Sequence, residues 1–274
     1  FSFSPIAMWG LLFVALWILL MCLTVVFRRQ WSEKEKLIYP LLYLPMEVTD
    51  DIDGSSLVGA FFRNRIMWIG FAIAFLYNVG NIANAYNPQI LALGKYYDIG
   101  RLFTERPLSA LRPMQIHYRP EMIGFGYLMS TEVAMSVWVF YLVLKLESLV
   151  TAVMGVQLAG FPYAQEQSMG AYVAMAFTLL FVARHHLWDV IRKAFSSAPD
   201  VDDTGEPMSY RTAVIGGLIA LAVTVGWMLF AGMSLWLTMV YLGLILMTAL
   251  VYTRIRAEIG VPLVWMFPYS QQYR

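Results

Sequence analysis

The stretch that decides the fold is residues 66–92, IMWIGFAIAFLYNVGNIANAYNPQILA, in which no residue is charged. The nearest charged residues are Arg65 before it and Lys95 after it. A helix needs about 20 residues to cross the hydrocarbon core of a bilayer, because each residue adds about 1.5 Å. The stretch therefore predicts a membrane-spanning helix over residues 66–87, which Pro88 ends.

Three asparagines interrupt this apolar helix. Asn78, Asn81 and Asn84 are spaced three residues apart. At about 100° per residue they share one slanted face that is about 120° wide. Each side-chain amide carries donors and an acceptor that lipid cannot satisfy. This face is therefore expected to meet protein, water or a bound solute.

The composition extends the same interpretation to the whole chain. Of 274 residues, 59% are hydrophobic and 14% are charged, whereas about 25% are charged in a soluble domain. The mean hydropathy is +0.62. The sequence therefore predicts an all-α fold, a polytopic transmembrane helical bundle that forms a single integral membrane domain over residues 1–274, in contact with the lipid bilayer. The predicted spans are residues 6–27, 66–87, 122–144, 169–187, 212–230 and 235–254.

Two apolar segments between the spans are too short to cross. Residues 37–46, LIYPLLYLPM, are expected to lie at the membrane interface or to re-enter the protein. Residues 148–162 are broken by glycine and proline, which fits a re-entrant segment, with an interfacial loop as the alternative. Gln157 and the following Glu166 supply polar groups at this point.

One carboxylate falls within a predicted span. Glu132 lies inside residues 122–144, where a charged side chain costs about 3 kcal/mol at the centre of a membrane helix. Glu132 is therefore expected either to line a polar pathway or to be satisfied locally by Ser130 or Ser136.

The fifth span and the segment before it carry two further signals. Gly216, Gly217 and Gly226 are small enough to let neighbouring helices approach closely. Residues 196–207, SSAPDVDDTGEP, have the composition of a solvated linker.

Six simple spans would place the basic loop 28–65 opposite the basic loops 95–119 and 184–211, so the positive-inside rule leaves the orientation open.

Several classes of function lack their signature. A net charge of +1 argues against nucleic acid as a partner. The metal-protease HExxH, the GxSxG elbow and the phosphate-binding Walker loop are absent, so no catalytic residue, metal site or cofactor is predicted and the protein is not expected to be an enzyme. His185 and His186 are adjacent and point about 100° apart on a helix, which makes them a poor metal pair.

Four stretches together carry a resemblance: RQWSEKEKLIYPLLYLP from Arg29, GFPYAQEQSMGAY from Gly160, ARHHLWDVIRKA from Ala183 and RIRAEIGVPLVW from Arg254. They resemble an uncharacterised family of large bacterial polytopic membrane proteins that is distantly similar to oligopeptide and metal-chelate transporters. The likeness covers residues 9–267. It implies an integral protein of the bacterial inner membrane, a role in transport without a named substrate, and a chain that continues beyond both ends of this one.

The leading hypothesis is a transporter, or a core derived from one, that moves a small solute through a polar intramembrane site. Polar groups beside broken helices are how secondary transporters build such sites. The alternative is a structural or accessory subunit of a larger complex, with other membrane subunits or further copies of the chain as partners. The residues predicted to line the site are Asn78, Asn81, Asn84, Glu132, Gln157 and Glu166.

Overall fold

The structure is a computed structural model that describes residues 3–49, 60–94, 96–156, 161–196 and 202–260. Six of its helices are long and apolar enough to cross a membrane, which confirms an all-α polytopic membrane protein. The long helices are α1 (Phe3–Arg29), α4 (Arg65–Tyr86), α6 (Thr131–Val153), α7 (Ala164–Ser196), α8 (Tyr210–Phe230) and α9 (Leu235–Ile259). The shorter ones are the π-helix η1 (Gln30–Lys34), α2 (Pro40–Thr49), α3 (Ala60–Arg63), the 3-10 helices η2 (Ile99–Leu102) and η3 (Leu108–Leu111), and α5 (Pro120–Leu128).

The described chain divides into two compact units, which are considered separately. The bundle unit comprises residues 3–37 and 168–254, and therefore holds α1, α8 and most of α7 and α9. The hairpin unit comprises residues 38–167 and 255–260. That the two units together form one integral membrane domain stays a prediction.

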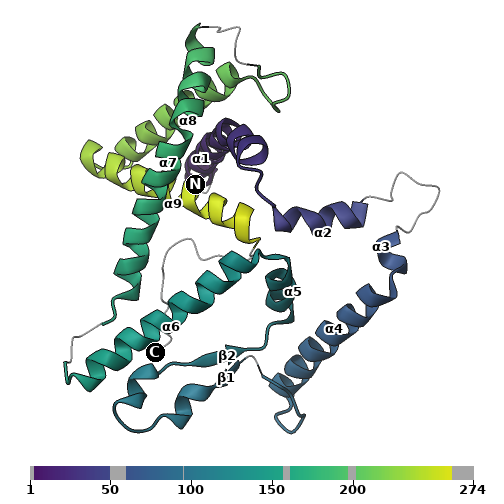
Figure 1. Ribbon diagram of the computed structural model, residues 1–274. Helices are drawn as coiled ribbons and strands as arrows, with labels where there is room; N and C mark the ends of the chain where they lie inside the picture. The colour runs from purple at the N-terminus through teal and green to yellow at the C-terminus, as the bar shows by residue number, and fades with distance from the viewer. Residues whose placement is uncertain (1–2, 50–59, 95, 157–160, 197–201, 261–274) are drawn as a thin grey trace. The chain divides into compact units, whose positions relative to one another are not determined.

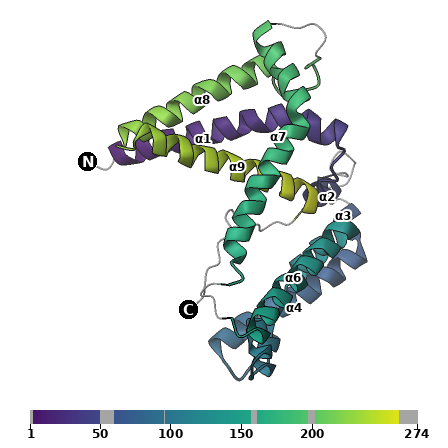
Figure 2. The same cartoon turned by 60° about the vertical axis from the view of Figure 1, so that its left-hand side comes forward.

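In the bundle unit, α1 and α8 run antiparallel along their whole length. At one end the Trp227 indole Nε1 donates to Met8 O over 2.8 Å. Near the middle, a Cβ placed on Gly217 would lie 3.4 Å from the Cβ of Cys22, so the two helices approach closely at this point. At the other end Arg28 pairs with Glu206, just before α8 begins. Figure 2 shows α1 between α8 and α9, with α7 crossing them.

Contacts of α7 and α9, the two remaining helices of the bundle unit, show which helix ends lie together. Arg254, in the last turns of α9, pairs with Glu35, which follows η1. His186 of α7 contacts Val26 O near the end of α1. The C-terminal ends of α1 and α9 and the N-terminal end of α8 therefore lie together. We call this the charged end of the bundle unit.

The hairpin unit is organised differently. Strands β1 (Tyr96–Asp98) and β2 (Gln115–His117) pair antiparallel, with Tyr96 opposite His117. The loop between them is held to α6 by Lys145, whose Nζ donates to Leu111 O over 2.9 Å and to Pro113 O over 2.5 Å. No residue of α4 or α6 is buried. Figure 1 shows the small hairpin and these two long helices.

The third predicted span differs most from the structure. Residues 122–144 were expected to form one helix, but Met129 and Ser130 are extended, so α5 ends at Leu128 and α6 begins at Thr131. Glu132 consequently lies in the first turn of α6 and not in the middle of a span. Residues 148–153 continue α6, so the expected re-entrant segment does not start at 148.

Candidate functional sites

The asparagine face of α4 is partly used by the turn that follows the helix. Asn81 Oδ1 accepts from the backbone N–H of Gly94 over 2.9 Å, and Asn84 Nδ2 donates to Ile90 O over 2.6 Å. Asn78 Nδ2 donates within the helix to Ala74 O over 2.8 Å. One polar atom of each amide therefore has a hydrogen-bond partner, which fixes the direction of the side chain.

The other half of each amide is free. Among the described residues, Asn78 Oδ1, Asn81 Nδ2 and Asn84 Oδ1 make no hydrogen bond. Phe71 and Phe75 precede Asn78 by seven and three residues and therefore continue its face toward the start of α4. Their rings stack with centroids 5.8 Å apart. The stripe offers aromatic surface followed by two amide acceptors and one amide donor.

The other predicted site residues are not joined to this stripe. Glu132 and Glu166 lie exposed in the first turns of α6 and α7, where a carboxylate is favoured by the helix dipole. No hydrogen bond or ion pair between described residues connects either carboxylate to the α4 amides. Gln157 lies outside the described residues.

The charged end of the bundle unit is a cluster that the sequence did not predict. Glu206, expected in a solvated linker, has a side chain that is only 2% exposed, whereas its partner Arg28 is 40% exposed. Arg28 Nε donates to Glu206 Oε2 over 2.7 Å, and the Tyr210 hydroxyl lies 3.4 Å from Oε1. Arg28 Nη2 also donates to Gly205 O over 2.8 Å. The linker is therefore anchored to the end of α1.

A second ion pair ties η1 to α9. Arg254 Nη1 donates to Glu35 Oε2, and Gln30 Nε2 donates to Glu35 Oε1 over 2.9 Å. The paired residues are 219 positions apart, so no local pattern announces the contact. Both side chains are largely buried. A π-helix such as η1 changes the direction of side chains relative to an α-helix, and often occurs at a functional position.

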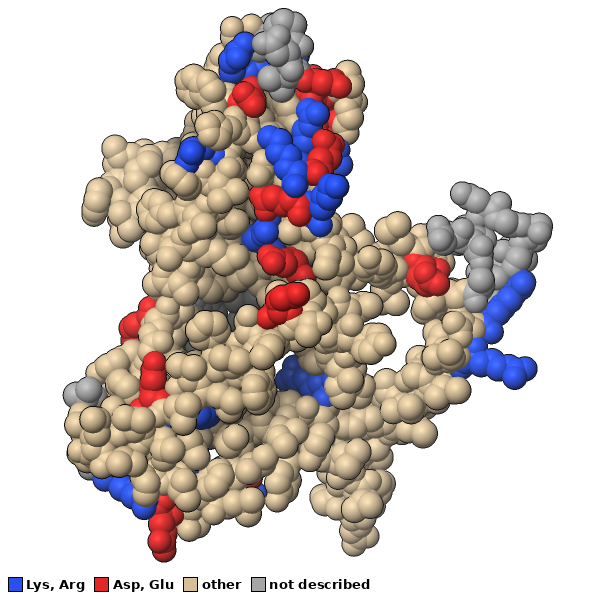
Figure 3. Space-filling view, viewed as in Figure 1, with Lys and Arg blue, Asp and Glu red and all other residues tan. Residues whose placement is uncertain are grey.

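His186 and Asp202 complete the charged end. His186 is buried, and its Nε2 lies 2.8 Å from Val26 O, so Nε2 carries the hydrogen and donates. The backbone N–H and the hydroxyl of Thr204 both donate to Asp202 Oδ1, which lowers the pKa of that carboxyl. In Figure 3 basic and acidic side chains lie side by side at this end. These groups mostly satisfy one another, which indicates a clamp and not an open polar site.

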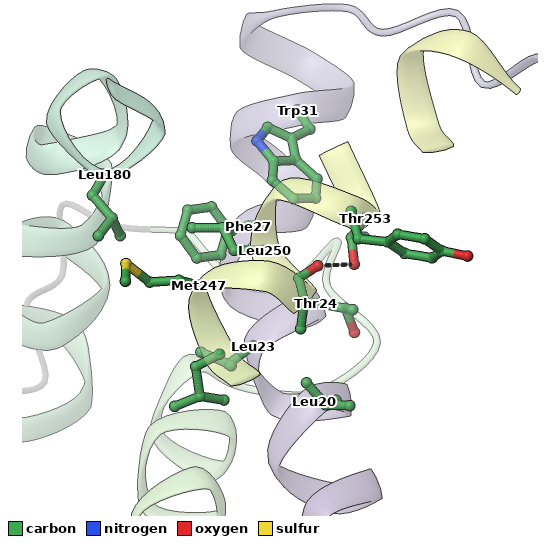
Figure 4. Close-up of a pocket in the computed structure, with 12 residues that line it drawn as sticks. Leu20, Leu23, Thr24, Phe27, Trp31, Leu180, Met247, Leu250 and Thr253 are labelled. Carbon is green, nitrogen blue, oxygen red and sulfur yellow. Dashed lines mark hydrogen bonds between the residues drawn. The ribbon is translucent and has the colours of Figure 1, made fainter. Parts of the chain in front are cut away.

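Beside the clamp, α1, α7 and α9 enclose an apolar crevice of about 310 Å³. Its threonine hydroxyls are satisfied within their own helices, since Thr24 donates to Met21 O and Thr253 to Ala249 O, each over 2.7 Å. Figure 4 shows Leu180, Phe27 and Met247 around it. Within the described residues, no three His, Cys, Asp or Glu side chains converge to hold a metal ion.

A family model described as a family of unknown function, DUF6785, matches residues 3–273. The chain belongs to this family. No curated protein and no solved structure matches the sequence. The expected membership in an uncharacterised family is therefore confirmed, whereas the distant similarity to oligopeptide and metal-chelate transporters stays a prediction.

Proposed function

We propose that this membrane protein is a transporter, or the core of one, that moves a small solute along the stripe of α4 formed by Phe71, Phe75, Asn78, Asn81 and Asn84. The observation that carries the proposal is the unpaired polar atom of each amide on a membrane helix that has no charged residue after Arg65. The proposal places the protein in the bacterial inner membrane and involves no catalytic step, metal or cofactor.

The orientation of the amides favours a solute over simple helix packing. Asn81 is held through its Oδ1 by Gly94, and Asn84 is held through its Nδ2 by Ile90. Their free atoms therefore point in fixed directions without a partner, which is the preorganisation that a binding site requires. An interhelical amide fastener contributes only about 0.6 kcal/mol and does not need such fixing.

The stripe also indicates the class of solute. Binding sites for small molecules combine apolar surface with a few placed polar groups. Stacked rings at Phe71 and Phe75 followed by amides at Asn78 and Asn81 suit a solute with an apolar part and a hydrogen-bonding part. Apolar amino acids and short peptides have both. Glu132 of α6 and Glu166 of α7 lie outside the stripe, and the proposal does not depend on them.

The test uses the full chain in liposomes, with leucine, dileucine and glucose as labelled probes. We expect uptake of leucine or dileucine but not of glucose. Asn78→Leu should lower that uptake at least tenfold, because Asn78 bonds only within its own helix and its loss leaves the turn after α4 intact. Asn87→Ala, at an asparagine beyond the end of α4, is the matched control and should retain uptake. Equal uptake by Asn78→Leu and the unchanged protein would overturn the proposal.

A second candidate function has its own observation. No residue of α4 or α6 is buried within the described chain, so both helices offer whole faces to a partner. In an accessory subunit these faces would pack against other membrane subunits or another copy. Purification from the native membrane distinguishes the two functions: stoichiometric co-purification of another subunit, with no uptake of any probe, supports the accessory role.

A further inference from the structure

The apolar crevice of the bundle unit has a size and a lining that select one kind of occupant. Its volume of about 310 Å³ is at the lower end of the range of about 300–1,000 Å³ for ligand pockets. A helix is about 10 Å across and would need a wider groove. The lining is almost wholly apolar, and the hydroxyls of Thr24 and Thr253 are already satisfied. The crevice therefore fits a slender apolar chain that makes no hydrogen bonds.

The crevice lies close to the charged end and so close to the membrane surface. Phe27 and Thr253 line it and are each followed directly by the arginine of an ion pair, Arg28 and Arg254. Trp31 also lines it, and tryptophan is enriched where membrane helices meet the headgroups. A lipid tail in the adjacent leaflet can enter the crevice without its headgroup leaving the surface.

Two exposed cations stand beside the crevice. Arg184 follows the lining residue Leu180 by four residues, so both lie on the same face of α7. Its guanidinium lies 4.0 Å from the centroid of the Phe181 ring. Lys34 follows Trp31 by three residues and is exposed on η1. Among the described residues neither cation has a carboxylate partner. Both are available to the phosphate of a lipid.

We propose that the crevice between α1, α7 and α9 holds one acyl chain of an anionic membrane phospholipid, with its headgroup against Arg184 and Lys34. The lipid joins three helices that belong to different parts of the sequence, next to the ion pairs that clamp the same helices. This inference concerns only the bundle unit and does not rest on the proposed transport along α4.

The test uses the full chain in nanodiscs that contain phosphatidylglycerol or phosphatidylcholine with a photoreactive group on one acyl chain. After illumination, we expect phosphatidylglycerol to label peptides of α7 and α9 that line the crevice. Met247→Trp fills the crevice and should lower this labelling at least fivefold. Met239→Trp is the matched control, because Met239 lies on the same helix, is exposed and does not line the crevice. Arg184→Gln should reduce the preference for phosphatidylglycerol over phosphatidylcholine.

Two results would overturn the proposal. One is labelling that is the same in Met247→Trp and Met239→Trp, which would show that the tail lies on the outer surface. The other is a crosslinked dimer with unlabelled crevice peptides, which would assign the crevice to a second copy of the chain. If Met247→Trp lowers the thermal stability of the protein, Leu250→Phe provides a smaller filling change at another lining residue.

Discussion

The bundle unit and the hairpin unit have similarly apolar helices but use them in opposite ways. In the bundle unit, α1 and α8 bury one stripe each and meet where Gly217 faces Cys22. In the hairpin unit, α4 and α6 bury no residue, and large side chains such as Trp68 and Phe140 are exposed. Small residues let membrane helices approach closely, whereas bulky ones keep lipid or a partner at the surface. Apolar composition therefore predicts a membrane helix but not what the helix packs against.

The bundle unit also constrains how the chain crosses the bilayer. Arg28 and Glu206 are paired, so the end of α1 and the start of α8 lie on the same side. The chain between Lys34 and Glu206 must then cross an even number of times. Its described residues contain three helices long enough to cross, α4, α6 and α7. An even number of crossings therefore requires that one of the three does not cross or that a further segment does.

The largest expected effect is therefore an all-or-none result in cysteine labelling. Single cysteines at Lys34, Thr204 and Ser234, in a Cys22→Ala background, are treated with a membrane-impermeant maleimide from each side. Lys34→Cys and Thr204→Cys should react from one side and Ser234→Cys from the other. The described lysines and arginines of the bundle unit lie toward the charged end, so the positive-inside rule predicts that Lys34→Cys and Thr204→Cys react from the cytoplasmic side. Reaction of Lys34→Cys and Thr204→Cys from opposite sides would restore six simple spans.

The next largest expected effect is the loss of stability when one partner of an ion pair is removed. Arg28→Met leaves the Glu206 carboxylate buried without its partner and should lower the free energy of unfolding by about 3 kcal/mol. In the hairpin unit, Arg101→Met removes an exposed pair at 3.9 Å and should cost less than about 0.5 kcal/mol. Denaturation of both variants in the same detergent measures the difference. Similar losses would mean that Glu206 is not buried in the protein.

Substitution of two glycines should give a somewhat smaller difference in stability, because only one of them lies where two helices pack closely. Gly217→Leu forces a side chain against Cys22 and should cost about 2 kcal/mol of stability. Gly70→Leu, on α4, has no atom within 4 Å of its added Cβ and should change stability by less than about 0.5 kcal/mol. A destabilised Gly70→Leu variant would show that α4 is packed against a partner at this face.

Helix boundaries were predictable where the sequence itself supplies them. The predicted span 66–87 differs by one residue at each end from α4, because Arg65 and Pro88 bound an uncharged run. The predicted span 122–144 stops before Lys145, whereas α6 continues through Lys145 to Val153, because the backbone carbonyls of Leu111 and Pro113 accept from the ammonium group. Small residue size predicted Gly216, Gly217 and Gly226 as contact residues. The structure places the first two against Cys22, whereas no described atom lies within 4 Å of a Cβ added to Gly226.

The candidate sites were predictable only where their residues lie close together in the sequence. The spacing of Asn78, Asn81 and Asn84 predicts the amide face, but it does not predict the hydrogen bonds that hold Asn81 and Asn84 to the turn at 87–94. The pairing of Glu35 with Arg254 joins residues 219 positions apart and has no local signature. Leu180 looks like any other apolar residue of its span until the fold brings α9 beside it.

The smallest expected effect tests how the hairpin unit holds together without a buried helical core. Lys145 donates from α6 to the loop between β1 and β2, through Leu111 O and Pro113 O. Lys145→Met keeps the apolar stem but removes both hydrogen bonds, which should cost about 1 kcal/mol locally. Hydrogen exchange over residues 96–117 should then rise about fivefold, while exchange in α8 stays unchanged. Lys145→Arg retains a donor and should protect the loop. Unchanged exchange in Lys145→Met would show that apolar contacts, as in the bundle unit, hold this hairpin in place.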